Sequence, residues 1–265
     1  MPETSYAGDY RPEVTDLSRE ELRNFLDWCA KLLGYEPTII GGWAVYAHVP
    51  GHLGSRDIDV VFPTNRAIDE VMDRYYAYNG FKCEGDLEKT FHKEAMVDGK
   101  TEKIIYDATS YERRNRLKEK DSIEIPWNLI ETHKERKDLA GLSLWTPSLE
   151  LLLLYKVKAY RDRSHELLHK GLLITPGDRN RLNSKIWKDA EDIKALDGLG
   201  KTGKKELNQL LRQTGFKEYY KETMREIRRV SQDCTKCGKT IRAGNPSQLK
   251  INVALHLKKH EIDGY

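Results

Sequence analysis

The sequence predicts an α+β fold: a mixed sheet with flanking helices, then a helical domain and a small tail rich in cysteine and histidine. Three patterns indicate this fold. Thr38–Phe62 contains two short apolar strands around a short helix, residues 148–232 are mostly helical in pattern, and the last 32 residues hold two of the four cysteines and two of the eight histidines. The 265 residues, 38% of them hydrophobic, are enough for one large domain or two smaller ones. We place the domain boundaries at 1–145, 146–231 and 232–265.

The N-terminal sequence pattern predicts an unstructured segment, Met1 to Pro12, followed by one long helix. Ser18 followed by Glu21 has the spacing of a capping box, so we expect the helix to begin there and to end at Gly34. The apolar stripe of this helix comprises Leu22, Phe25, Leu26, Cys29, Leu32 and Leu33. A second helix is expected over Asn65–Asn79.

A glycine pair follows the first predicted strand. Thr38–Ile40 is short and β-branched, which is typical of a buried strand. Gly41 and Gly42 end that strand and let the backbone approach a ligand closely. Because Trp43–His48 is expected to be helical, free N–H groups at the start of this helix lie beside the glycines and favour phosphate binding.

Two aspartates begin the next strand. Side chains alternate along a strand, so Asp57 and Asp59 point to one face while Ile58 turns into the core. Two carboxylates beside a phosphate site are the groups that a Mg²⁺-dependent phosphoryl or nucleotidyl transferase needs. The alternative is a pair of solvated aspartates, which leaves a charged pair around the isoleucine of an apolar strand unexplained.

The order Gly41-Gly42, helix and Ser55-x-Asp57-Ile58-Asp59 resembles the DNA-polymerase-β-type nucleotidyltransferase superfamily. The sequence GGWAVYA is similar to the corresponding sequence of lincosamide and aminoglycoside nucleotidyltransferases. Those enzymes usually have an acidic residue where this chain has Tyr46. The resemblance implies the nucleotidyltransferase fold, an NTP substrate and two Mg²⁺ ions held by Asp57 and Asp59. The nucleotide-binding residues that it implies are Gly41, Gly42, Ser55 and Arg56.

A third carboxylate is expected on a hairpin. Phe91–Val97 and Lys103–Ser110 flank the turn pair Asp98-Gly99, and Asp107 interrupts the apolar second strand. The superfamily takes its third metal carboxylate from a neighbouring strand, so the resemblance implies that Asp107 binds the metal and acts as base for the incoming hydroxyl. The alternative is an aspartate facing solvent. The remaining candidate carboxylates are then Glu94, Asp98 and Glu102.

Ser148–Arg163 predicts a helix after Thr146-Pro147. Its sequence, TPSLELLLLYKVKAYRDR, is similar to the lysine-bearing helix of the nucleotidyltransferase toxins of abortive-infection, type IV toxin–antitoxin systems. In those toxins a lysine faces the triphosphate, and Lys156 matches it. Lys156 shares a face with buried leucines, so we expect its ammonium at the edge of a cleft. The nearby side chains expected at the surface or in salt bridges are Lys158, Arg161 and Arg163.

The segment that begins at Lys188 resembles the Asp-bearing motif of the same toxins. Asp189 and Asp192 are three residues apart and therefore share one helical face. Two interpretations stay open: the aspartates orient Lys156 or the nucleotide, or they pair with Lys188 and Arg161.

The rest of this region predicts connections and further helices. Leu173–Asn183, with Pro176-Gly177-Asp178, is expected to be a loop. Asp197–Gly203 is glycine-rich but lacks both a preceding strand and the Gly-Lys-Ser/Thr wording, so we interpret it as a hinge rather than a phosphate loop. Lys204–Gln232 is expected to form one or two helices with a break at Thr214-Gly215.

The tail predicts a structural zinc site of the C2H2 type. Cys234 and Cys237 have the spacing of a zinc knuckle, and His256 and His260 lie one helical turn apart. A tail this short cannot bury a core and needs a metal to fold. Four protein ligands leave no open position, so the zinc is expected to be structural. The linker is longer than in a usual finger, and the alternative is two free thiols with two unrelated histidines.

Charge is distributed unevenly along the chain. Residues 201–265 contain fifteen Lys and Arg against seven Asp and Glu, a net charge of +8, whereas the first 200 residues have a net charge of −5. A basic tail indicates a polyanionic partner, with RNA or DNA first, and a solvated basic surface or a protein-binding finger as the alternatives. The basic residues near the predicted finger are Lys236, Lys239, Arg242, Lys250, Lys258 and Lys259.

No apolar run approaches the length of a membrane span, and the first residues lack a signal-peptide pattern. Four cysteines do not make a disulfide framework at this length, so we expect a reducing cytoplasm and no membrane partner. The leading prediction is a Mg²⁺-dependent transferase that moves a nucleoside monophosphate from an NTP to RNA, tRNA especially, as a toxin-like enzyme with an antitoxin as a candidate partner. The alternatives are a small-molecule (antibiotic) nucleotidyltransferase and a non-catalytic nucleotide- or nucleic-acid-binding protein.

Overall fold

A computed structural model describes residues 11–84, 90–170, 175–228, 230–234, 236–243, 253–254, 256–258 and 260. These residues belong to two compact units, Met1–Phe216 and Lys217–Tyr265. Most of the predicted unstructured N-terminal segment, residues 1–10, lies outside the described residues. Three of the predicted helices of 146–231 belong to the first unit and one to the second, and our three domain boundaries stay predictions.

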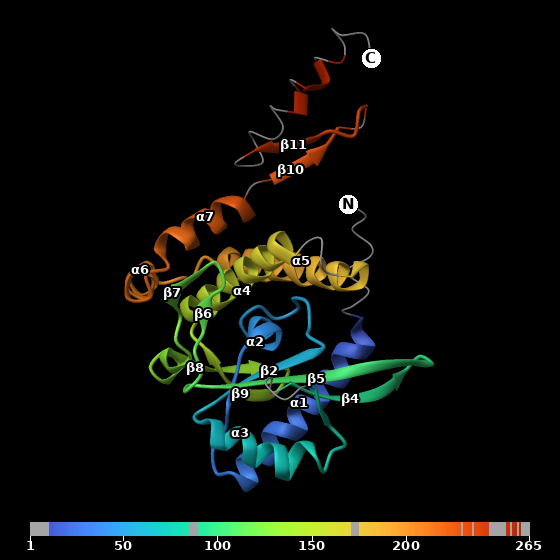
Figure 1. Cartoon of the computed structure of the whole chain (residues 1–265), viewed down its shortest axis with the longest axis vertical. Coiled ribbons are helices and arrows are strands. Elements are labelled where there is room, and N and C mark those ends of the chain that lie inside the picture. Colours follow the sequence, from blue (N-terminus) through green and yellow to red (C-terminus); the bar gives the residue numbers. More distant parts are fainter. Residues whose placement is uncertain are drawn as a thin grey trace. The chain divides into compact units, whose positions relative to one another are not determined.

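A seven-stranded mixed sheet forms the centre of the first unit (Figure 1). Its spatial order is β3-β4-β5-β2-β1-β9-β8, with the pairs β1–β9 and β2–β5 parallel and the others antiparallel. Its strands are β1 (Thr38–Ile39), β2 (Asp57–Phe62), β3 (Lys82–Glu84), β4 (Thr90–Val97), β5 (Lys100–Ser110), β8 (Lys134–Leu139) and β9 (Leu142–Pro147). The predicted mixed sheet with flanking helices is confirmed. A separate two-stranded ribbon consists of β6 (Arg116–Leu117) and β7 (Lys120–Glu124).

Helices cover both faces of this sheet. In Figure 1, α1 and α3 lie on one face, and α2, α4 and α5 lie on the other. The helices of the first unit are α1 (Pro12–Leu32), α2 (Gly41–His48), α3 (Asn65–Val71), the π-helix η2 (Met72–Tyr76), the 3-10 helix η3 (Trp127–Glu131), α4 (Leu149–Lys170), α5 (Pro176–Gly198) and α6 (Lys204–Gln213). The second unit contains α7 (Lys217–Ile227) and the hairpin β10 (Val230–Asp233) and β11 (Thr240–Ala243). Among the described residues, no helix has both the length and the apolarity that crossing a membrane requires.

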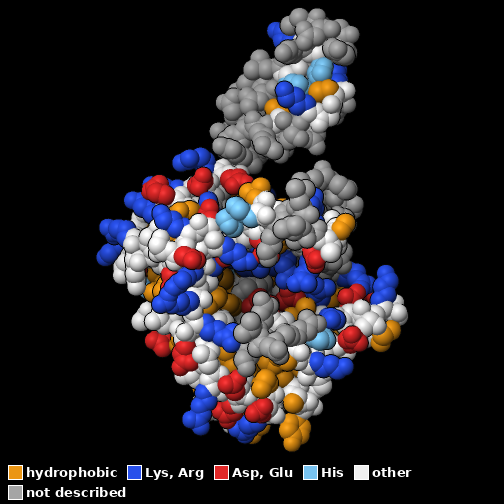
Figure 2. Space-filling model, viewed as in Figure 1, with side chains coloured by type: hydrophobic (Ala, Val, Ile, Leu, Met, Phe, Trp, Pro, Cys, Tyr) orange, Lys and Arg blue, Asp and Glu red, His pale blue; other side chains and the backbone are white. Residues whose placement is uncertain are grey.

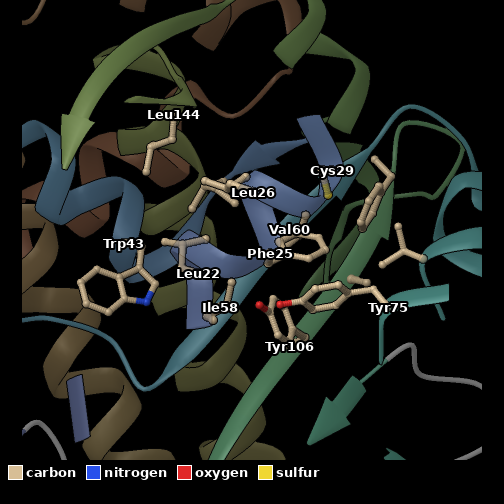
Figure 3. Packing of buried hydrophobic residues seen from close by; sticks show 14 of the residues in the cluster. Leu22, Phe25, Leu26, Cys29, Trp43, Ile58, Val60, Tyr75, Tyr106 and Leu144 are labelled. Carbon is tan, nitrogen blue, oxygen red and sulfur yellow. The ribbon is translucent and has the colours of Figure 1, made fainter. Parts of the chain in front are cut away.

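The core of the first unit lies between α1 and the sheet (Figure 3). Phe25 of α1 is fully buried and packs against the aromatic rings of Phe62, Tyr75 and Tyr106 at centroid distances of 5.1–6.4 Å. Such aromatic packing fixes the position of β2 and β5, which also hold the predicted site residues. The predicted stripe on α1 does not extend to Leu32, which is 54% exposed.

The start of α1 corrects one prediction. The helix begins at Pro12 rather than at Ser18, because proline is well suited to the first turn of a helix. Ser18 is instead buried within the helix, where its hydroxyl accepts a hydrogen bond from the Trp43 indole (3.1 Å). Glu21 accepts hydrogen bonds from Tyr75 (2.8 Å) and Lys93 (2.6 Å). Both residues therefore join α1 to distant elements and do not cap it.

The start of α5 corrects a second prediction. Leu173–Asn183 is not a loop throughout, because α5 begins at Pro176. The hydroxyl of Thr175 accepts a hydrogen bond from the Asp178 N–H at 3.1 Å, so Thr175 is the N-cap and the proline lies in the first turn. Residues 171–174 lie outside the described residues. The helix therefore includes residues 176–183, which were predicted as part of the loop.

The predicted hairpin and the break in the last helices are confirmed. Val97 pairs with Lys100 across Asp98 and Gly99, whose φ angles of 50° and 74° suit a tight turn of two residues. The second predicted helix continues from α3 into a π-helical turn at Met72–Tyr76. A short connection at 214–216 separates α6 from α7, as expected from Thr214-Gly215.

Candidate active site and metal centre

One hollow in the first unit contains most of the predicted site residues. On the face in Figure 2, Lys and Arg side chains gather around a hollow in which acidic side chains are visible. It is lined by residues of β2, β5, α2, α4 and α5, together with the segment before β2. These residues are Gly42, Ser55, Arg56, Asp57, Asp59, Asp107, Lys156, Arg163, Arg181, Ser184, Lys185, Lys188 and Asp189.

Three carboxylates line this hollow from two neighbouring strands. Asp57 and Asp59 flank the fully buried Ile58, so strand alternation places both on the same side of β2. In the parallel pair β2–β5, Asp59 lies directly opposite Asp107. The Asp107 carboxylate accepts a hydrogen bond from Thr90 of β4 at 2.7 Å. Pairing of the strands therefore gathers three acidic groups within a small volume.

The other candidate carboxylates lie away from the hollow. Glu102 pairs with Arg11 at 2.5 Å, and Asp98 lies 3.6 Å from the same guanidinium. Glu94 is exposed on β4. None of these three carboxylates lines the hollow as it is described. Asp107 is thus the hairpin carboxylate that lies beside Asp57 and Asp59.

The three carboxylates have unequal electrostatic environments. Burial raises the pKa of Asp59 to about 6, and the negative charges of Asp107 and Asp57 add to this shift. Burial also acts on Asp57, but the positive charges of Lys185 and Arg56 outweigh it and lower the pKa of that carboxyl. The site therefore keeps Asp57 ionised and opposes ionisation of Asp59 at mildly acidic pH.

This donor set fits a hard divalent cation. Oδ1 of Asp57 is buried and accepts no hydrogen bond from any residue within the described ranges. A buried carboxylate oxygen without a donor is costly unless a cation or water satisfies it. Mg²⁺ prefers carboxylate oxygens and relieves the mutual repulsion of neighbouring acids. The residues that would hold such ions are Asp57, Asp59 and Asp107.

The glycine pair packs directly against residues that line the hollow. Gly41 has a φ of +66°, and a Cβ placed there would lie 1.8 Å from Oδ2 of Asp59. A Cβ at Gly42 would lie 2.7 Å from Oγ of Ser55 and 2.8 Å from Nζ of Lys188. Both positions thus require glycine, the first for its backbone conformation as well. No side chain caps the start of α2, and its first N–H groups suit an anion.

A wall of basic side chains faces the carboxylates. It comprises Arg56 from the segment before β2, Lys156 and Arg163 from α4, and Arg181, Lys185 and Lys188 from α5. Nucleotide binding is predicted from the sequence for two of them, Arg56 and Lys156. The α5 residues lie at i, i+4 and i+7, the spacing of one helical face. That spacing indicates one basic helical face, but it is recognised only if Arg181 is helical, and the prediction placed Arg181 in a loop over residues 173–183.

Asp192 lies behind this wall and pairs with two of its members. Its fully buried carboxylate lies 2.6 Å from Nζ of Lys156, 3.1 Å from Nζ of Lys188 and 2.9 Å from Nε2 of His52. Although burial alone would raise the pKa of Asp192, the charges of Lys156 and Lys188 lower it well below its usual value. Burial tends to lower the pKa of Lys156, but Asp192 and Asp189 raise it. The buried lysine is therefore held in its charged form.

The contacts of Asp189 and Asp192 include partners from both interpretations. Both aspartates pair with Lys156, and Asp189 also pairs with Arg163. Asp192 pairs with Lys188 as well, whereas Arg161 pairs with Glu119. Both aspartates are buried, and Asp189 lines the hollow whereas Asp192 does not. Lys158, expected at the surface or in a salt bridge, is buried and pairs with Asp162 at 2.5 Å.

The tail brings together its four predicted zinc ligands. One ligand atom of each of Cys234, Cys237, His256 and His260 lies within 4.8 Å of all the others. Sγ of Cys234 is 3.5 Å from His260, and Sγ of Cys237 is 3.3 Å from His256. Ligand bonds of about 2.0–2.3 Å to tetrahedral zinc separate neighbouring donors by roughly these distances. The donor set and spacing therefore fit zinc.

The knuckle in this cluster has the expected backbone geometry. The N–H of Gly238, with φ +70°, donates to the carbonyl of Cys234 at 2.8 Å, and the N–H of Cys234 donates to the carbonyl of Lys239 at 2.9 Å. The exposed lysines beside it are Lys236, Lys239 and Lys258. Arg242 lies on β11, and Lys250 and Lys259 lie outside the described residues.

Comparison with known proteins gives a likeness of fold at low identity. No protein-family model matches the chain, and no characterised protein sequence does so. An antigenic nucleotidyltransferase-like protein from Paracoccidioides brasiliensis is 15% identical with a TM-score of 0.44, over 79% of this chain and 92% of that one. The antibiotic-resistance factor ANT(2'')-Ia is 14% identical with a TM-score of 0.45, over 80% of this chain and 97% of that one.

Proposed function

We propose that this protein is a Mg²⁺-dependent nucleotidyltransferase that moves a nucleoside monophosphate from an NTP to an acceptor hydroxyl. The observation that supports it is the arrangement of three carboxylates on paired strands opposite six basic side chains in one hollow. A triphosphate needs cations along its length, and metal-assisted transfer needs clustered carboxylates at the reacting phosphorus. Both requirements are met within a single site.

Each group has a proposed task. N–H groups at Gly41 and Gly42, the Ser55 hydroxyl and the side chains of Arg56 and Lys156 bind the β- and γ-phosphates. Asp189 and Asp192 hold the basic wall in position. When bound by Asp57, Asp59 and Asp107, two Mg²⁺ ions supply positive charge at the attacking and leaving oxygens.

The reaction balances without a further co-reactant. The acceptor oxygen forms a bond to the α-phosphorus, the bond from that phosphorus to the bridging oxygen breaks, and pyrophosphate leaves. The proton of the acceptor hydroxyl passes to the carboxylate of Asp107. Asp59 lies opposite Asp107 in the strand register, so both carboxylates would be available to hold the metal.

RNA, and tRNA especially, is the acceptor that we propose. Residues 201–265 have a net charge of +8, and three exposed lysines lie in the Cys/His tail. Basic side chains supply most of the affinity for phosphate backbones. Structural zinc would hold this tail in a form that presents them. A toxin-like role with an antitoxin partner in a reducing cytoplasm is consistent with an RNA acceptor.

Transfer of label from each radiolabelled NTP tests this function. The acceptors are total tRNA, an aminoglycoside and a lincosamide, each with and without Mg²⁺. We expect labelled tRNA only with Mg²⁺, and we expect Asp57→Ala with Asp59→Ala to reduce transfer at least about 100-fold, as for loss of a group that stabilises the transition state. The control is Glu94→Ala, which removes an exposed carboxylate from β4.

The acceptor is decided by the same assay. Label on the aminoglycoside or lincosamide alone would replace RNA by a small molecule as the acceptor. Label on no acceptor, with NTP binding intact, would favour a non-catalytic role. We expect Cys237→Ser to reduce tRNA labelling and Cys83→Ser, which changes an exposed cysteine outside the cluster, to leave it unchanged.

A further inference from the structure

Two cationic side chains lie beside Asp57, the carboxylate whose charge a metal ion would otherwise neutralise. Nζ of Lys185 lies 3.4 Å from Oδ2 of Asp57, and Nε of Arg56 lies 3.6 Å from its Oδ1. The Asp57 side chain is 19% exposed, so these charges act in a partly dehydrated environment where they are weakly screened. A divalent cation that binds Asp57 must overcome repulsion from both.

Lys185 differs from the other lysines of the basic wall. Lys156 and Lys188 are each 9% exposed and are held by Asp192, which does not line the hollow. Lys185 is 28% exposed, and within the described part of the chain its one ion pair is with Asp57. Lys185 is therefore the wall lysine whose present partner is a proposed metal ligand.

The same helical face reaches the anion-binding glycines. Lys188, three residues after Lys185 on α5, has its Nζ 2.8 Å from the position of a Cβ at Gly42. Residues three apart on a helix are neighbours. The four-carbon stem of a lysine is flexible, so the Lys185 ammonium is able to move from Asp57 toward a triphosphate that lies along the start of α2.

We infer that Lys185 exchanges partners during substrate binding: it pairs with Asp57 in the free protein and with the triphosphate in the loaded protein. This inference rests on the proposed function of the hollow. The exchange makes metal and triphosphate binding cooperative, because the triphosphate removes a competing cation from Asp57. By thermodynamic linkage, metal bound at Asp57 equally releases Lys185 for the triphosphate.

Mn²⁺ binding to the nucleotide-free protein tests the first half of the exchange. Free Mn²⁺ is measured by electron paramagnetic resonance during titration of the full chain. We expect Lys185→Met to tighten Mn²⁺ binding about fivefold or more, the lower end of typical couplings between ligands. Lys194→Met is the matched control on the same helix, because Lys194 is exposed, pairs with Glu191 at 2.7 Å and lies outside the hollow. It should leave the Mn²⁺ affinity unchanged.

Binding of inorganic tripolyphosphate to the metal-depleted protein tests the second half. The affinity is measured by calorimetry. Lys185→Met should weaken tripolyphosphate binding about fivefold or more, since a cation is lost from the wall. Asp57→Asn should strengthen it, because Lys185 no longer has a competing carboxylate partner. Lys185→Arg keeps the cation and should keep both affinities near those of the unaltered protein.

The outcomes separate this inference from the proposed function. If the unaltered protein binds both ligands and Lys185→Met changes neither affinity, the exchange is wrong and the metal site stands. If Lys194→Met tightens Mn²⁺ binding as much as Lys185→Met does, the effect is one of overall charge and the exchange is again wrong. If the unaltered protein binds no Mn²⁺, the proposed metal site fails, while the tripolyphosphate titrations still decide whether Asp57 restrains Lys185.

Discussion

The hollow and the Cys/His cluster both offer metal ligands, but different forces hold those ligands in place. Asp57, Asp59 and Asp107 stand on paired strands of a seven-stranded sheet, with fully buried Ile58 between the first two. The cluster ligands lie between Cys234 and His260, around a hairpin with strands of four residues each. We therefore expect the sheet to form the first site in advance, and we expect the second site and its local fold to depend on each other.

The difference follows from how much apolar surface each region buries. The core between α1 and the sheet includes Ile58 and Val60 of β2 and Tyr106 of β5. We therefore expect it to hold the acids together against their repulsion without a metal. A segment the size of the tail buries too little apolar surface to offset its loss of conformational entropy. Metal ligation supplies the missing stability in domains of this kind.

Removal of metal is the sharpest test of this comparison, and it has the largest expected effect. Structural zinc contributes on the order of 10–16 kcal/mol in finger peptides. We expect a strong zinc chelator to abolish hydrogen-exchange protection in peptides covering residues 230–260 and to leave peptides from β2 and β5 protected. Elemental analysis of the purified chain should find one zinc per protein, and this zinc should be lost in Cys237→Ser and kept in Cys83→Ser.

Two results would contradict the expectation that the sheet folds without metal and the tail does not. Loss of protection in β2 or β5 on chelation would mean that the sheet also depends on the metal. Persistence of protection in residues 230–260 without metal would mean that the tail folds by its own packing. In either case the contrast between a preformed site and a metal-dependent fold would be wrong.

Two glycines of left-handed conformation test how tightly the hollow is preformed. Gly41 and Gly51 have φ angles of +66° and +85°, but a Cβ would meet Asp59 only at Gly41, since nothing lies within 4 Å at Gly51. We expect both alanine variants to lose about 1–2 kcal/mol of stability from the backbone. Gly41→Ala must also displace Asp59, and a displacement of about 1 Å costs on the order of 100-fold in rate.

The measurements are chemical denaturation and the NTP transfer assay on both variants. Gly51→Ala should keep its transfer rate, which isolates the effect of the displaced carboxylate from that of the backbone. Equal rates in Gly41→Ala and Gly51→Ala would mean that the position of Asp59 is not critical for transfer.

The acids and glycines of the hollow differ from its α5 basic residues in how far the sequence predicts them. Asp57, Asp59 and the glycines lie within one short stretch, and strand alternation alone places the two acids on one face. Lys185, just after the predicted loop, was assigned no role, and Arg181 was missed because Pro176-Gly177 indicates a turn as readily as a helix start. The N-cap hydrogen bond from the Asp178 N–H to Thr175 decides between the two, and it is visible only in the structure.

Tertiary partners explain the other miss. Ser18 and Glu21 have the spacing of a capping box, but their actual partners, Trp43 and Tyr75, lie 25 and 54 residues away in the sequence. A local pattern does not distinguish a cap from a pair of long-range contacts. Local alternation and motif order were therefore reliable in the strands, and the helix start predicted at Asn65 is also correct. The starts of α1 and α5 instead depended on contacts that only the folded chain reveals.

The smallest expected effect is on the free energy of unfolding of the metal-free protein, which the buried acids of the hollow lower. Burial, with the charges of Asp107 and Asp57, raises the pKa of Asp59 from 3.8 to about 6. Between these values the folded chain holds a proton that the unfolded chain has released, so the free energy of unfolding falls as pH rises from about 4 to about 6. The expected loss is on the order of 2–3 kcal/mol.

Urea denaturation in the presence of a chelator, at pH values from 4 to 7.5, measures this dependence. Asp59→Asn should remove it and should be more stable than the unaltered protein above about pH 6, because no buried charge forms there. Glu94→Gln, which changes an exposed carboxylate on β4, should keep it. A lower stability of Asp59→Asn above pH 6 would show that Asp59 stabilises the fold in its ionised form, and the acidic site would then need no metal to offset its repulsion.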